Sequence, residues 1–155
     1  MQIEGRPCRV PREMLPLKVY APLAAYRDTT QQAMDLWNAV GLTFHVRFFE
    51  QVESREDAQI VVDWTGTKVP PKRAGITFFR VNSASLEIND IGIRDQGEGP
   101  NAALVEILAH EFGHCLGLDH SAQAGDLMYA SYTGKYSKPD AKLSGRDAWI
   151  VSWLY

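Results

Sequence analysis

The stretch His110–His120, "HEFGHCLGLDH", holds three of the four histidines of this 155-residue chain. His110 and His114 are four residues apart, so in a helix both rings project from the same face. Two imidazoles at this spacing can reach one Zn²⁺ ion at about 2.0–2.1 Å. The pattern therefore predicts a metal-binding helix, with Glu111 beside the metal but not bound to it, where a base can take a proton from water.

A catalytic zinc usually has three protein ligands and a water, so the helical pair needs a third residue. Gly117 tolerates a positive φ and is predicted to end the helix and turn the chain sharply back. His120 then approaches the same ion from a new direction. No Glu occurs after Glu111, which excludes a zinc site completed by a downstream Glu. His45 is predicted to be a strand residue and not a ligand.

The sequence on either side predicts one α+β domain over residues 1–155. Apolar residues recur at helical spacing from an N-cap at Asp28 or Thr29 to Gly41. Asn101 is predicted to cap the central helix, 102–116, and Ser144 with Asp147 forms the capping-box pattern of a closing helix. Strands are predicted at 17–20, 42–49, 58–64, 76–81 and 85–90, of which 58–64 is apolar enough to be covered on both faces.

Composition limits the class of protein. Hydrophobic residues make up 45% and charged residues 23% of the chain, as in ordinary globular domains. A net charge of -3 argues against nucleic-acid or anionic-membrane partners, and no apolar run is long enough to span a membrane. Residues 1–10 lack the apolar core of a signal peptide and include "IEGR", a protease site often added to recombinant proteins. They are either native, a leader remnant or an added segment, so the compartment stays open, with secretion favoured over the cytoplasm.

The central stretch has the H-E-x-x-H-x-x-G-x-x-H form of the metzincin metallopeptidases, and "DLMYASY" (126–132) resembles their Met-turn. Within the metzincins the chain resembles the matrixins, the matrix-metalloproteinase type. Ser121 after the third His, the ending "LSGRDAWIVSWLY", and the first-half stretches "AMDLWNAVGLTFHV" and "DAQIVVDW" carry this resemblance. It implies a zincin-like fold with one twisted mixed sheet of about five strands, three helices, and an active-site helix ending at Gly117.

The resemblance also implies a function: a zinc-dependent endopeptidase with one catalytic Zn²⁺ and Glu111 as general base for a metal-activated water. It places Met128 beneath the zinc as an apolar floor, which differs little from a core Met, and Tyr132 in the wall of the specificity pocket. Glu106 would face that pocket and favour a basic or polar substrate side chain; the alternative is a solvated helix residue. A protein or peptide substrate would lie extended along the strand that includes Ile76 and Phe78. The domain is expected to act as a monomer.

Departures from the family pattern indicate a minimal, microbial-type domain. No His lies between Gly66 and Asn101, so a structural zinc is not expected, and calcium binding through Asp90, Asp95 or Glu98 is left open. Cys8 weakly resembles the inhibitory cysteine of the family, in which a thiolate caps the zinc; the alternative is an incidental thiol. A catalytically silent or latent zinc-binding module is the rival function, and the intact Glu111 argues against it.

Overall fold

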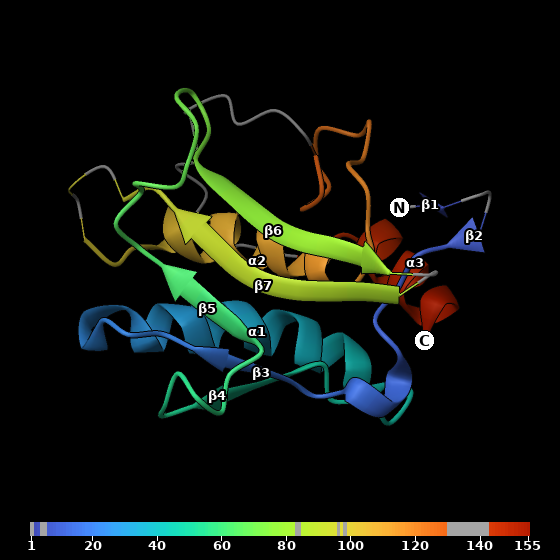
Figure 1. The fold of residues 1–155 in the computed structure, drawn as a ribbon. Helices are drawn as coiled ribbons and strands as arrows, with labels where there is room; N and C mark the ends of the chain where they lie inside the picture. The colour runs from blue at the N-terminus through green and yellow to red at the C-terminus, as the bar shows by residue number, and fades with distance from the viewer. Residues whose placement is uncertain (1, 4–5, 83–84, 96, 98, 130–142) are drawn as a thin grey trace.

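The computed structural model describes residues 2–3, 6–82, 85–95, 97, 99–129 and 143–155 (Figure 1). In chain order the strands are β1 (Gln2–Ile3), β2 (Arg6–Pro7), β3 (Leu17–Tyr20), β4 (Phe49–Val52), β5 (Ile60–Asp63), β6 (Gly75–Asn82) and β7 (Ser85–Ile93). The α-helices are α1 (Arg27–Leu42), α2 (Ala102–Cys115) and α3 (Gly145–Leu154), and short 3₁₀ turns are η1 (Arg12–Met14) and η2 (Ala24–Tyr26). None of these helices is long and apolar enough to cross a membrane.

The main sheet has five strands in the order β4-β3-β5-β7-β6. β3 runs parallel to β4 and β5, and β5 runs parallel to β7, whereas β6 is antiparallel to β7 and forms the outer edge. A β-bulge between Phe78 and Phe79 shifts the register of that edge strand. The predicted mixed sheet of about five strands with three helices is confirmed.

Helices α1 and α2 pack against each other, and α2 also packs on β6 and β7 (Figure 1). Trp37 of α1 is fully buried, and its indole N–H donates to the carbonyl of Ala109 in α2 at 2.8 Å. Phe49 of β4 and Phe112 of α2 stack with ring centroids 4.6 Å apart. The core therefore lies between the sheet and the two helices, and it holds α2 beneath the edge strand.

Two strand predictions need correction. The predicted strand 42–49 is wrong, because α1 continues to Leu42 and a turn follows before β4. The amide of Val46 donates to the carbonyl of Gly41 at 2.9 Å, and a Cβ on Gly41 would overlap with the Val46 carbonyl oxygen. His45 is an exposed turn residue at φ 61°. The apolar and polar residues of this segment alternate because its apolar side chains pack into the core, and not because the segment is a strand.

Strand β5 was expected to be covered on both faces. Ile60 and Val62 are fully buried, but the alternate residues Val61 and Asp63 are only half-buried. The strand thus has one core face and one partly open face, because α1 and α2 share one side of the sheet.

The predicted starts of two of the three α-helices are confirmed. The side chain of Asn101 accepts from the Leu104 amide and caps α2, and both bonds of the capping box at the start of α3 are present. The predicted cap of α1 is wrong. That helix begins at Arg27 directly after η2, and Tyr26, at its N-cap, makes no side-chain capping bond. Because η2 leads straight into the first turn of α1, a separate capping side chain is not needed there.

Candidate metal centre and active site

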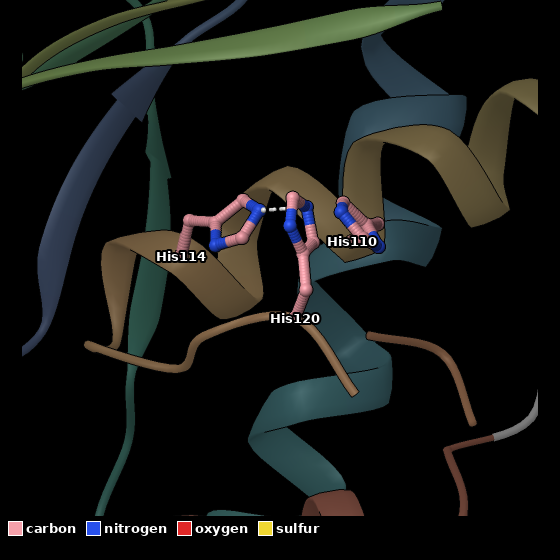
Figure 2. A group of neighbouring side chains, drawn as sticks. All are labelled: His110, His114 and His120. Atoms are coloured by element: carbon pink, nitrogen blue, oxygen red, sulfur yellow. Dashed lines mark hydrogen bonds between the residues drawn. The ribbon is translucent and has the colours of Figure 1, made fainter. Parts of the chain in front are cut away.

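Three histidine side chains converge at one point (Figure 2). His110 and His114 project from α2, and His120 reaches toward them from the segment that follows the helix. Each offers one ring nitrogen, and the three nitrogens lie within 4.8 Å of one another. Among the described residues, these histidines form the one group of three or more side chains that could hold a metal ion.

The chain reversal that delivers His120 occurs at Gly117. Helix α2 ends at Cys115, and Gly117 has a φ of 91°. A Cβ at this position would also overlap with the backbone carbonyl oxygen of Cys8. The amide of Leu118 then donates back to the carbonyl of Gly113 at 3.1 Å. Glycine is therefore required twice at this turn, for its backbone angle and for its lack of a side chain.

The donor set suits a zinc ion. The Nδ1 atoms of His110 and His114 each lie 2.8 Å from a backbone carbonyl, those of Leu127 and Leu118. A carbonyl only accepts, so each Nδ1 carries the proton and each Nε2 keeps its lone pair for a metal. The Nε2 atoms of His114 and His120 are 3.2 Å apart. Two nitrogens on one tetrahedral zinc would be separated by about 3.3 Å.

Burial keeps the helical histidines neutral. It lowers the pKa of His110, and it lowers the pKa of His114 to about 4, with a smaller contribution from the neighbouring His110. A neutral imidazole is the form that binds a metal. Both rings are therefore in the ligand form at neutral pH.

Glu111 lies in a niche formed by strand β6. Its side chain is buried, and the Thr77 hydroxyl lies 2.6 Å from the carboxylate Oε2. A Cβ on Gly75 would lie 2.7 Å from the other carboxylate oxygen. Burial raises the pKa of Glu111 to about 7, against the opposing effects of the Thr77 hydrogen bond and the positive charge of Arg73. A carboxyl group with such a pKa can both take up and release a proton near neutral pH.

Met128 lies on the opposite side of α2 from this niche. It is 1% exposed, and a Cβ on Gly113 would overlap with its sulfur and lie 2.9 Å from Trp37. The backbone carbonyl of Met128 accepts from the amide of Ser121 at 2.7 Å, directly after the third His. Met128 thus packs on the helical turn between the two ligand positions. This location agrees with an apolar floor, and that role stays a prediction.

Asp147 connects α3 to the histidines, a link that the sequence reasoning missed. This fully buried carboxylate accepts from the Leu127 amide at 2.9 Å, and the Leu127 carbonyl faces Nδ1 of His110. The capping-box pattern predicted only the local bond of Asp147 to Ser144. Thr77 and Gly75 were missed as well; the single available signal was a polar residue in the otherwise apolar "ITFF" segment of β6.

The predicted substrate residues lie on the two elements that border the niche. Ile76 is half-buried and Phe78 is 36% exposed, both on β6, and Glu106 is half-buried on α2 one turn before His110. Tyr132 lies outside the described residues. The role of these residues in specificity stays a prediction.

Cys8 is not brought to the histidines. It is fully buried in the core, next to the turn at Gly117, and it is not part of the metal-binding group. Burial raises the pKa of its thiol, which opposes formation of the thiolate that a metal requires. The arrangement gives no support to an inhibitory role for this cysteine.

The predicted calcium residues have other contacts. Asp90 pairs with Lys68 at 3.0 Å, and Asp95 accepts a hydrogen bond from the hydroxyl of Tyr26. Glu98 lies outside the described residues. Calcium binding through this set stays open as a prediction.

Two of the hollows on the described part of the molecule can be compared with the site. The larger, about 1020 Å³, lies between α1 and α3 and includes none of the predicted site residues. The smaller, about 410 Å³, lies between α3 and the segment after Gly117, and its lining includes His120, Met128 and Asp147. The smaller hollow therefore reaches one of the three histidines, His120, whereas the larger hollow reaches none of them.

Known proteins share this sequence pattern. The family model described as Matrixin matches residues 94–155, which include the whole histidine motif. Stromelysin-3 of Xenopus laevis is 31% identical over 83% of this chain and 28% of its own length. Human neutrophil collagenase is 46% identical over 72% of this chain and 32% of its own length. Bovine interstitial collagenase is 63% identical over 52 residues, which are 34% of this chain and 10% of that protein.

The chain spans about a third or less of the length of these curated relatives. The region that the family model matches nevertheless includes the helix of the motif, the turn at Gly117 and the third histidine. Together with the five-stranded mixed sheet and the converging histidines, the matches lead to one conclusion: the chain carries a matrix-metalloproteinase-like domain of the matrixin family.

Proposed function

We propose that this chain is a zinc-dependent endopeptidase that hydrolyses peptide bonds of proteins or peptides. The observation that carries the proposal is the position of Glu111, a buried carboxyl group on the same helix as two neutral histidines that point at a third. The relatives include proteins named collagenase and stromelysin, which supports a protein substrate.

In this proposal His110, His114 and His120 hold one zinc ion through their ring nitrogens. When bound, the ion supplies Lewis acidity, which polarises the scissile carbonyl and lowers the pKa of a water molecule. Glu111 accepts a proton from the attacking water and returns it to the leaving amine. Asp147, through the backbone of Leu127, would keep the His110 ring in the tautomer whose Nε2 is free to bind a metal.

The substrate is proposed to bind along β6 as an added strand. β6 is the edge of the sheet, so its outer backbone groups have no strand partner within the described residues. Backbone pairing gives affinity in this mode, and side-chain contacts give specificity. Ile76 and Phe78 would contribute such contacts, and Glu106 would favour a basic or polar side chain. We further propose that the domain acts as a monomer outside the cytoplasm.

The test is cleavage of a diverse peptide library, read by mass spectrometry, with and without a metal chelator. We expect chelator-sensitive cleavage by the wild-type protein, restored by added zinc. Glu111→Gln should lower the rate by at least about 100-fold, because a general base contributes about 10²–10⁴-fold. Its zinc content should stay unchanged, because Glu111 is not a ligand.

The matched controls separate ligands from other residues. His114→Ala should lose zinc and activity, whereas His45→Ala removes an exposed histidine outside the metal-binding group and should change neither. Cleavage that persists in the chelator, or in Glu111→Gln, would refute the mechanism. Stoichiometric zinc without any cleavage would instead identify a catalytically silent zinc-binding module.

A further inference from the structure

We propose that Thr77 is a positioning residue for the general base, holding the Glu111 carboxylate in place between strand β6 and helix α2. The inference rests on the proposed endopeptidase function. It assigns to the substrate-binding strand a direct part in orienting the group that moves the proton.

The first observation is the pair of contacts that the Thr77 hydroxyl makes. Its oxygen lies 2.6 Å from Glu111 Oε2 and 3.1 Å from the backbone carbonyl of the same residue. Thr77 is in β6 and Glu111 is in α2, so these contacts cross from the sheet to the helix. The hydroxyl therefore fixes the carboxylate relative to the edge strand as well as to its own helix.

The second observation is the space that β6 leaves for the carboxylate. Gly75 and Thr77 are two residues apart, so their side-chain positions point to the same face of the strand. A Cβ on Gly75 would lie 2.7 Å from Oε1 and 3.0 Å from Cγ of Glu111. Gly75 thus provides room and Thr77 provides the donor, and the carboxyl group is bounded by both.

A threonine hydroxyl has one proton to donate, and a charged carboxylate only accepts hydrogen bonds. The Thr77 hydroxyl therefore donates to Oε2 of the ionised Glu111. Because this bond occupies one carboxylate oxygen, Oε1 is the oxygen left to accept the proton of the reacting water and to return it to the leaving amine.

The position of Thr77 indicates that its hydroxyl affects the chemical step and not the binding of the substrate. A substrate strand would pair with the outer backbone groups of β6, and removal of the Thr77 hydroxyl leaves that backbone unchanged. The exposed Phe78 points to the opposite face of the strand. The loss of the hydroxyl should therefore act on kcat and leave KM nearly unchanged.

The test compares Thr77→Val, which keeps the shape and removes the hydroxyl, with Thr77→Ser, which keeps the hydroxyl. We expect Thr77→Val to lower kcat about 10–100-fold, the usual cost of losing a residue that orients a catalytic group. KM and zinc content should stay close to the wild-type values, and Thr77→Ser should restore kcat. Thr43→Val is the matched control, because Thr43 is exposed at the end of α1 and its hydroxyl bonds only locally, to Val40.

A second readout does not depend on activity. Crystal structures of the metal-free variants should show the Glu111 carboxylate in its niche in Thr77→Ser and displaced from it in Thr77→Val. A wild-type kcat in Thr77→Val, or an unmoved carboxylate, would overturn the inference. If thermal unfolding shows that Val is not tolerated, Thr77→Ala carries the same test. A wild-type protein that cleaves nothing would refute the proposed function, while the crystal structures would still decide the role of Thr77.

Discussion

At the scale of single residues, Glu111 combines two properties that oppose each other. A base must be ionised to accept a proton, yet burial of its carboxyl group disfavours the charge and raises its pKa to about 7. The Thr77 hydroxyl and the charge of Arg73 offset part of that penalty. Ionisation of Glu111 therefore lowers the stability of the folded metal-free protein.

This cost gives a prediction for the metal-free protein. Because the folded pKa of Glu111 is raised, its favourable contribution is present below about pH 4.5 and is lost as the pH rises through 7. In Glu111→Gln this loss is absent, so the variant should gain about 2 kcal/mol over the wild type between pH 5.5 and 8.5. Urea unfolding of both proteins in chelator measures the difference. The lowered pKa of His114 acts in the opposite direction but is present in both proteins, so it cancels. Parallel pH profiles would contradict the prediction.

The residues of the site differ in how far the sequence could predict them. His110, His114 and His120 follow from spacing, because a helical turn and a glycine fix where each ring points. The contact between Thr77 and Glu111 joins residues 34 positions apart, and no local pattern contains that information. The link from Asp147 through Leu127 to His110 has the same origin, since it depends on where α3 docks.

At the scale of elements, the end of α2 determines whether the site is complete. Asn101 starts the helix with a side-chain cap and Gly117 ends its course with a positive φ. The two helical histidines need only the helix, but the third needs the reversal. The backbone of Cys8 occupies the space where a side chain on Gly117 would lie, so the amino-terminal segment supports the same turn.

Gly117→Ala should therefore destabilise the protein more than the addition of one methyl group usually does. The left-handed backbone alone costs about 1–2 kcal/mol in a residue with a Cβ, and the overlap with the Cys8 carbonyl adds to this. Zinc affinity should fall as well, because His120 follows the displaced turn. Gly145→Ala is the control: a Cβ there meets no atom within 4 Å, and the change should stabilise the protein by about 0.4–1 kcal/mol. Urea unfolding and competition for zinc with a chromogenic chelator measure both effects; equal behaviour of the two variants would contradict the argument.

The elements that the sequence predicted well are those whose ends have local chemical causes. α2 and α3 begin at side-chain caps, and β3 has the bounds that the sequence predicts. The strand predicted over 42–49 was wrong because Gly41 lets the chain turn back until Val46 lies against it, a turn contact that the alternating pattern does not indicate. The predicted start of α1 was wrong because η2 continues into the helix without a capping side chain.

At the scale of the whole molecule, a bound metal would join two parts of the fold through three side chains. His110 and His114 come from α2 and His120 from the segment after it, which also bonds to Met128. An ion that binds only the folded arrangement stabilises the protein by mass action.

Zinc at 1,000 times its dissociation constant should therefore add about 4 kcal/mol, which corresponds to about 10 °C in Tm for a domain of this size. Differential scanning calorimetry across a zinc titration, with excess chelator as reference, measures the shift. His120→Ala should remove most of it, because two remaining ligands bind the ion weakly. A Tm that does not depend on zinc would contradict a metal site in the folded protein.

The edge strand β6 has a further consequence, for how the protein behaves in concentrated solution. An unpaired edge attracts another copy of itself as readily as it attracts a peptide, and proteins limit this with charges and bulges. Here Lys72 and Arg73 are exposed just before the strand, and the bulge between Phe78 and Phe79 interrupts its register. The bulge divides β6 into two shorter regular stretches, which limits the pairing of two copies. Any such dimer would occlude the strand that takes the substrate, so self-association and loss of activity would rise together with protein concentration.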